Sequence, residues 1–94
     1  MLNVTKTALD RLSHRLARQK AAADVALRFT RREGGWTLGS DRTRPGDVTF
    51  THDGRNVLVL DVVAAESMTD LTLDIRHTSA GPRLRLRRST RRPG

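Results

Sequence analysis

The 94-residue sequence contains no cysteine, and this absence excludes several kinds of chemistry from the chain itself. Disulfide bonds, thiolate metal sites, cysteine nucleophiles and cysteine-held metal clusters all need a sulfur atom that the chain does not supply. Aromatic residues are also scarce, since only Phe29, Trp36 and Phe50 are present. The core must therefore be aliphatic and built from leucine, valine and alanine.

The sequence also lacks long apolar runs. No stretch approaches the roughly 20 apolar residues that a membrane-spanning helix requires, and residues 1–17 contain no run that resembles a signal peptide. We therefore expect a cytoplasmic protein without membrane association. The length fits one small domain, which buries about 60–65% of the surface that its unfolded chain exposes. Hydrophobic residues at 36% and charged residues at 30% are typical of a globular chain.

The positive charge is concentrated at the C-terminal end. The chain has 18 basic and 10 acidic residues, which gives a net charge of +8. The last twelve residues hold six arginines and no acid, and without them twelve bases face ten acids, a net charge of +2. Arginine outnumbers lysine sixteen to two. Because arginine binds phosphate in a bidentate manner, this composition suits nucleic acid or an acidic partner, although an arginine-rich codon preference produces the same bias.

The N-terminal segment has the pattern of an amphipathic helix. Thr5 is placed to cap a helix over residues 6–20, because its hydroxyl can accept a hydrogen bond from a backbone N–H at the helix start. Leu9, Leu12 and Leu16 recur at helical spacing, so they form one apolar face that we expect to pack on a sheet. The arginines on the opposite side are expected to face solvent, and they are Arg11, Arg15 and Arg18.

Alternating apolar residues predict strands over residues 25–30, 36–38, 48–50, 56–60, 71–75 and 84–86, with a short edge strand at 2–4. Turns are expected at residues 31–35, 41–47 and 78–82. Asp53-Gly54 is the strongest hairpin signal, because a type I′ turn needs positive φ at both central positions. The run 56–60 is apolar on both faces, which predicts a central strand. Asp61 should cap a short helix over residues 62–68.

We therefore expect an α+β fold, a small, mostly antiparallel β-sheet or sandwich of about six strands. An N-terminal amphipathic helix and a short second helix complete it.

No combination of residues points to catalysis or to a metal site. His14, His52 and His77 lack the spacing of metal ligands. The aspartates fall mainly at expected turns and caps, where they bind the local backbone. No serine lies in a nucleophile elbow, and Gly34-Gly35 is too short for a phosphate-binding loop. We therefore expect no enzyme activity, no cofactor and no bound metal.

The arginine-rich C-terminus is the one interaction feature of the sequence. Arginines two residues apart on a strand project from one face about 6.6–7 Å apart, which is comparable to the spacing of phosphates. No aromatic residues alternate with them, although single-stranded nucleic acid is usually bound by stacking. A solvated strand face with a solubilising tail explains the same residues. The candidate anion or nucleic-acid contacts are Arg83, Arg85, Arg87, Arg88, Arg91 and Arg92.

Several segments together resemble the sequence pattern of one known family. The most specific is residues 47–54, which read D-V-T-F-T-H-D-G and are followed by V-L-V-L-D and then Ser67. Weaker matches are residues 27–29, 35–38, 71–75 and 83–86. Over residues 2–87 the chain resembles the HesB-like domain, the A-type carrier family of iron–sulfur cluster assembly.

The departures from this family pattern fall on its chemistry. In the family, three cysteine thiolates hold iron or a cluster, commonly between subunits, and they come from a G-C-S-G loop and a C-terminal C-G-C-G motif. Here residues 31–35 are too short for that loop, and the C-terminus is rich in arginine instead. Thiolate ligation selects such clusters, so the resemblance implies a carrier scaffold without the cluster site.

We expect one HesB-like domain over residues 1–87 and a basic, disordered tail over residues 88–94. Two functions remain open. The first is a non-enzymatic interaction or regulatory role, through a protein partner or through the self-association that is common in the family. The second is nucleic-acid binding through the arginine-rich C-terminus.

Overall fold

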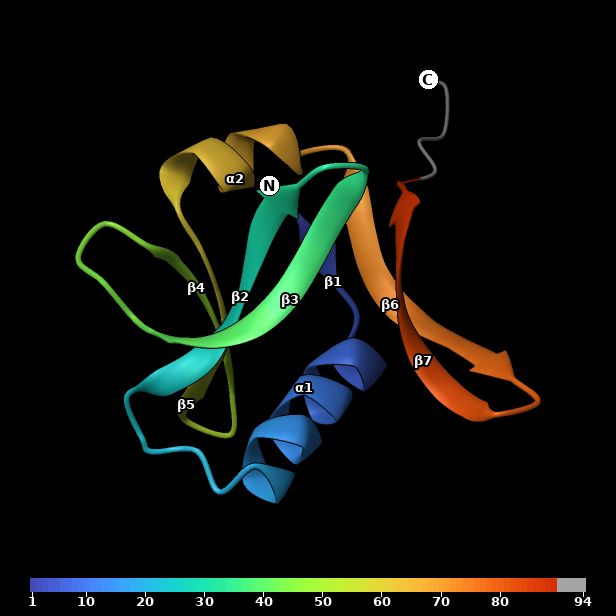
Figure 1. Cartoon of the computed structure of the whole chain (residues 1–94), viewed down its shortest axis with the longest axis horizontal. Helices are drawn as coiled ribbons and strands as arrows, with labels where there is room; N and C mark the ends of the chain where they lie inside the picture. The colour runs from blue at the N-terminus through green and yellow to red at the C-terminus, as the bar shows by residue number, and fades with distance from the viewer. Residues whose placement is uncertain (90–94) are drawn as a thin grey trace.

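The computed structural model describes residues 1–89, and within them the chain forms two helices and seven strands (Figure 1). Their order is β1 (Asn3–Val4), α1 (Lys6–Arg18), β2 (Val25–Arg32), β3 (Gly35–Arg42), β4 (Val48–His52), β5 (Arg55–Leu60), α2 (Val62–Ser67), β6 (Leu71–Thr78) and β7 (Gly81–Arg88). The expected α+β fold is confirmed, including the short edge strand at the start of the chain.

The strands form two separate sheets. A four-stranded sheet has the order β3-β2-β5-β4, and a three-stranded sheet has the order β1-β6-β7. The three hairpins pair in the antiparallel direction, whereas β1 pairs with β6 and β2 with β5 in parallel. The expectation of a mostly antiparallel arrangement therefore holds. The run that is apolar on both faces, Val57 to Leu60, is fully buried in β5, between β2 and β4.

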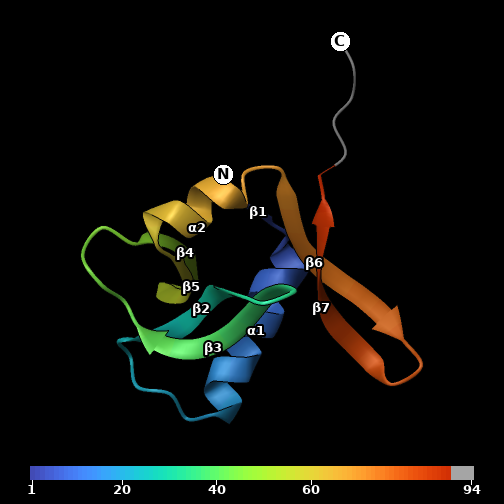
Figure 2. The ribbon, with the colours of Figure 1, turned by 45° about the horizontal axis from the view of Figure 1, so that its top comes forward.

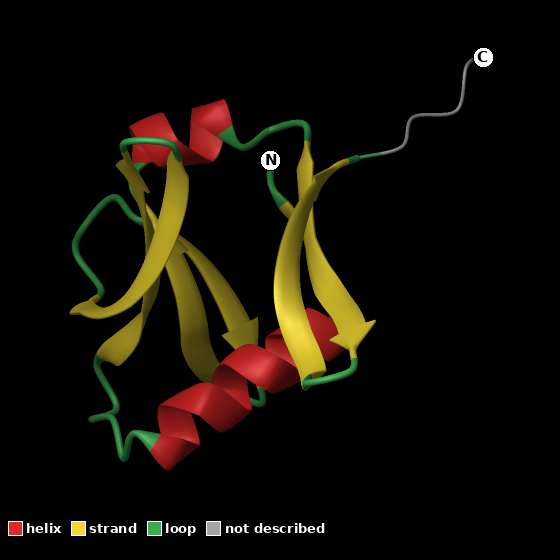
Figure 3. Cartoon of the chain, turned by 45° about the vertical axis from the view of Figure 1, so that its right-hand side comes forward, coloured by secondary structure: helices red, strands yellow, loops and turns green. Residues whose placement is uncertain are grey.

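Helix α1 joins the two sheets. Thr5 caps it as expected, with its hydroxyl accepting a hydrogen bond from the Ala8 N–H at 3.2 Å. Leu12 and Leu16 are completely buried, and the helix contacts strands of both sheets, β5 on one side and β6 on the other. Figure 3 shows α1 crossing beneath both sheets, with α2 on the opposite side of the molecule. One apolar helix face thus supplies the centre of the core.

The turns explain how the strands reverse. Asp53 and Gly54 have φ values of 52° and 77°, the positive angles that a type I′ hairpin needs, and they connect β4 to β5. Asp61 caps α2 through a 2.7 Å hydrogen bond from the Ala64 N–H. Both features were predicted by the sequence.

All three expected turns are shorter than the sequence pattern indicates. Residues 33–34 form the turn expected at 31–35, and residues 79–80 the one expected at 78–82, because strand pairing extends further on both sides. The prediction of a turn over residues 41–47 is wrong at its start, because β3 continues to Arg42. The strands β2 and β3 pair along their whole length, so backbone pairing extends β3 through a polar stretch that has no apolar alternation. The chain then turns only at Arg44 to Asp47.

The burial of the α1 face predicts a large effect of its truncation. We expect Leu16→Ala to lower the free energy of unfolding by about 3 kcal/mol, because it removes buried methyl groups and leaves a cavity. Val63→Ala is the control, since Val63 on α2 is 73% exposed and its truncation should change stability by less than about 0.5 kcal/mol. Urea denaturation of both variants measures the difference. Equal losses would contradict the role of α1.

Candidate functional site

The structure separates the arginines that the sequence suggested as one binding face. Asp74 lies opposite Arg85 in the β6–β7 ladder and accepts hydrogen bonds from Arg85 Nη2 at 3.0 Å and from Arg87 Nε at 2.6 Å. Asp74 is therefore a strand residue and not a turn or cap residue. These bonds lower the pKa of the Asp74 carboxyl to about 2. Two of the candidate cations are thus engaged inside the molecule.

The remaining candidate arginines lie in different places. Arg88 is the last residue of β7 and is exposed, and the chain continues in register to Ser89, whose N–H donates to the Asp70 carbonyl at 2.7 Å. Arg91 and Arg92 lie outside the described residues. Arg83 is near the start of β7, on the wall of a groove that the sequence did not reveal.

The apolar section of this groove lies between the two sheets. It is a cavity of about 440 Å³, open to solvent, with one wall from β2 and β3 and the other from β6 and β7. Trp36 packs edge-on against Phe29, with ring centroids 6.5 Å apart. The wall residues are Phe29, Trp36, Leu38, Leu73, Leu84 and Leu86.

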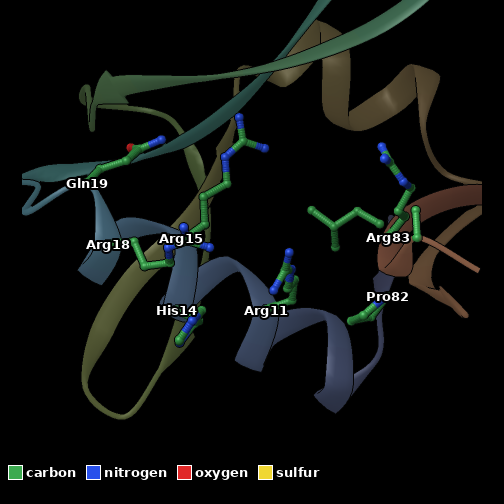
Figure 4. Close-up of a pocket in the computed structure, with 9 residues that line it drawn as sticks. Arg11, His14, Arg15, Arg18, Gln19, Pro82 and Arg83 are labelled. Atoms are coloured by element: carbon green, nitrogen blue, oxygen red, sulfur yellow. The ribbon is translucent and has the colours of Figure 1, made fainter. Parts of the chain in front are cut away.

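A cationic section adjoins the apolar one. It is an open cavity of about 720 Å³ between α1 and the β6–β7 hairpin, and it shares Arg15 and Leu84 with the apolar section. Figure 4 shows Arg15 of α1 and Arg83 of β7 on opposite sides of this opening, with Arg11 between them. Of the arginines expected to face solvent, Arg15 and Arg18 are exposed and Arg11 is partly buried, and all three line a concave surface.

The cations of the groove have no acidic partner within residues 1–89, and none of the residues lining its two sections is acidic. The arginines that do form ion pairs within residues 1–89 lie outside the groove lining, and they are Arg28, Arg42, Arg44, Arg85 and Arg87. The unpaired set is Arg11, Arg15, Arg18 and Arg83. Spacing along α1 could have indicated three of them, since residues 11, 15 and 18 share one side of a helix. The position of Arg83 on β7 opposite this side of α1 could not be predicted from the sequence.

A second charge cluster is buried in the four-stranded sheet. Arg28 binds Asp47 in a bidentate manner, at 3.1 and 2.5 Å, and donates from Nε to Asp41 at 2.8 Å. These bonds raise the pKa of Arg28 and lower the pKa of Asp47. The pKa of Asp41 is lowered first by the Arg42 N–H, which donates to its carboxylate at 2.8 Å, and then by the neighbouring arginines. Arg28 and Asp47 belong to two of the sequence segments that carried the family resemblance. Here they form a structural link between β2 and the turn before β4, and Arg44, which donates to Asp41 at 3.1 Å, supplies the second cation of the cluster.

The β2–β3 connection has no room for a ligand-binding loop. Arg32 pairs with Gly35, so only Glu33 and Gly34 form the turn, and Gly34 takes the positive φ of 80° that this tight turn requires. His52 Nε2 contacts two carboxylates, Asp10 at 2.6 Å and Asp53 at 3.5 Å. Among residues 1–89, no three His, Asp or Glu side chains gather as metal ligands would. Neither helix of that part is long and apolar enough to cross a membrane.

Comparison with known proteins identifies relatives in structure. SufA from Escherichia coli, involved in the biosynthesis of iron–sulfur clusters, matches with a TM-score of 0.71 and 20% identity over 93% of this chain and 84% of its own. IscA, crystallised with a [2Fe–2S] cluster, matches with a TM-score of 0.60 and 22% identity, over 94% of this chain and 85% of its own. An Aquifex aeolicus protein solved by NMR matches with a TM-score of 0.64 and 23% identity, over 92% of this chain and 89% of its own.

No family model and no curated protein matches the sequence. At identities of 20–23%, the three likenesses establish the shared fold. The fold implied by the sequence resemblance is therefore confirmed.

The buried Arg28 cluster predicts a difference between two aspartates. We expect Asp47→Asn to lower the free energy of unfolding by about 2 kcal/mol, because it weakens a buried charged hydrogen bond. Asp24→Asn is the matched control, since the Asp24–Arg42 pair is exposed, 3.5 Å apart, and should contribute less than about 0.5 kcal/mol. Chemical denaturation at neutral pH measures both, and similar losses would refute the assignment.

The Asp74 contacts predict a pH dependence. Because the pKa of Asp74 is lower in the folded state, its stabilisation is present at neutral pH and is lost as the pH falls from about 4 towards about 2. We expect Asp74→Asn to reduce the fall in stability over this window. Arg88→Gln, on the same hairpin but outside the ion pair, should retain the wild-type slope. Thermal unfolding at several pH values decides, and parallel slopes for wild type and Asp74→Asn would contradict the prediction.

Proposed function

We propose that this chain, which has the HesB-like fold of the A-type iron–sulfur carriers, acts as a non-enzymatic protein-interaction domain that holds no cluster by itself. The observation that carries the proposal is the groove between the sheets, whose apolar and cationic walls come from α1, β2, β3, β6 and β7. It offers complementarity to a partner surface, whereas we identify no nucleophile or acid–base pair around it. The cytoplasm is the location that this role suits.

The residues present do not fit an iron–sulfur cluster. Such clusters are held by cysteine thiolates, or by histidine in place of some of them, and the chain has no cysteine. The tight turn at Glu33-Gly34 leaves no loop to bring ligands towards the groove. The groove itself is lined mainly by leucines, aromatic rings and arginines. His14 is the one metal-ligating side chain among its lining residues, and a single imidazole does not hold a cluster.

The alternative of nucleic-acid binding through the C-terminal arginines has less support. Arg85 and Arg87 share the carboxylate of Asp74, which cancels part of the charge that would meet phosphates. Trp36, the single tryptophan, packs edge-on against Phe29 with Arg31 over its ring at 5.2 Å, and no aromatic residue lies among the C-terminal arginines to stack on bases. No observation in residues 1–89 favours this alternative over a protein partner.

Anaerobic reconstitution with ferrous iron and sulfide tests the cluster part of the proposal. We expect the purified chain to acquire no stable, stoichiometric visible chromophore, because it supplies no thiolate. IscA, treated in parallel, is the positive control for the procedure. A chromophore that survives gel filtration with the chain at a fixed iron-to-protein ratio would overturn the proposal.

A further inference from the structure

We propose that the groove binds an extended peptide segment in which apolar residues adjoin a run of acidic residues. The inference rests on the proposed function and names the chemistry of the partner. The groove has two sections in line, an apolar one between the sheets and a cationic one between α1 and the β6–β7 hairpin, joined at Arg15 and Leu84. A ligand that fills both must therefore change from apolar to anionic along its length.

The apolar section leaves hydrophobic side chains incompletely covered. Trp36, Leu38, Leu84 and Leu86 are only partly buried, although they pack against the core. They face one another across the gap between two sheets that share no strand. Covering such side chains with apolar groups of a partner removes their surface from water, which is the main favourable contribution to association.

The cationic section determines the sign of the partner's charge. Arg11, Arg15, Arg18 and Arg83 converge on it from two elements and form no ion pair within residues 1–89. Arginine donates bidentate hydrogen bonds to carboxylates, so glutamate and aspartate side chains are fitting ligands. A second copy of this chain, with a net charge of +8, would bring mainly like charge to this surface.

The sheet edges favour an extended backbone over a helix. Each sheet ends at the groove in an edge strand, β3 on one side and β7 on the other. Figures 1 and 2 show these two strands on the same side of the molecule. An edge strand presents unpaired backbone N–H and C=O groups, with which an extended peptide can pair while its side chains enter the groove.

A peptide titration with the full chain tests this proposal. The probe is a synthetic peptide about ten residues long, with an apolar half of alternating leucine and serine and an acidic half of glutamates, prepared in both orders. Trp36 is the only tryptophan and lines the groove, so its fluorescence reports occupancy of the apolar section. We expect saturable binding at low salt that weakens as the ionic strength rises.

Matched variants locate the binding. Arg15→Gln combined with Arg83→Gln should weaken binding of the probe about tenfold, because one exposed cation is removed from each side of the groove. Arg32→Gln, an exposed arginine outside the groove, should leave the affinity unchanged. A peptide with lysines in place of the glutamates should not bind. Circular dichroism confirms that the variants remain folded.

Several outcomes would overturn the inference. The first is that neither peptide order binds, and the second is that the double variant binds the peptide with the same affinity as wild type. The third is that oleate, a fatty-acid anion added as a separate probe, shifts the fluorescence of Trp36 whereas the peptide does not. Tighter, competing binding of an RNA oligonucleotide would favour the nucleic-acid alternative instead. Cluster reconstitution reports on the proposed function separately. If the peptide does not bind and no chromophore forms, only the peptide-binding proposal fails. If a cluster chromophore forms, the proposed function itself fails.

Discussion

The burial of one face of α1 against both sheets is the constraint on which the structure depends. The sheets share no strand, and the helix that contacts both of them buries Leu12 and Leu16 completely. This packing holds β2 and β3 apart from β6 and β7 at a spacing that leaves an apolar groove between them. The same helix then directs Arg11, Arg15 and Arg18 towards the groove mouth. Core packing and surface chemistry are thus properties of two faces of one helix.

The distribution of charge has a similar logic. A net charge of +8 suggests a uniformly basic surface, yet five of the sixteen arginines form ion pairs with aspartates within residues 1–89. Arg28 is enclosed by Asp41 and Asp47, while Asp74 engages two arginines of β7. Compensated pairs of this kind stabilise the fold or specify its geometry and offer little to a ligand. The cations that stay unpaired at the groove are therefore the better indicators of a binding site.

The likeness to SufA and IscA illustrates how a scaffold and its chemistry separate. This chain builds the shared fold from aliphatic strand packing, helix caps and a type I′ hairpin. Cluster binding needs ligands such as cysteine sulfur at defined positions, and this chain has no cysteine. Asp47, in the segment that most resembles the family pattern, and Arg28, in a weaker match, form a buried ion pair. A sequence motif can therefore mark a structural contact as readily as a reactive one.

The sequence by itself determined the local features of this protein. The cap at Thr5, the hairpin at Asp53-Gly54 and the central strand β5 follow from hydrogen bonding and backbone preferences that act within a few residues. It also excluded thiolate chemistry outright, because no cysteine exists. Only the tertiary structure decided which arginines are free, since Asp74 and Arg85 meet through strand pairing and Arg15 and Arg83 through packing. Such encounters depend on the approach of distant segments, which periodicity along the chain does not encode.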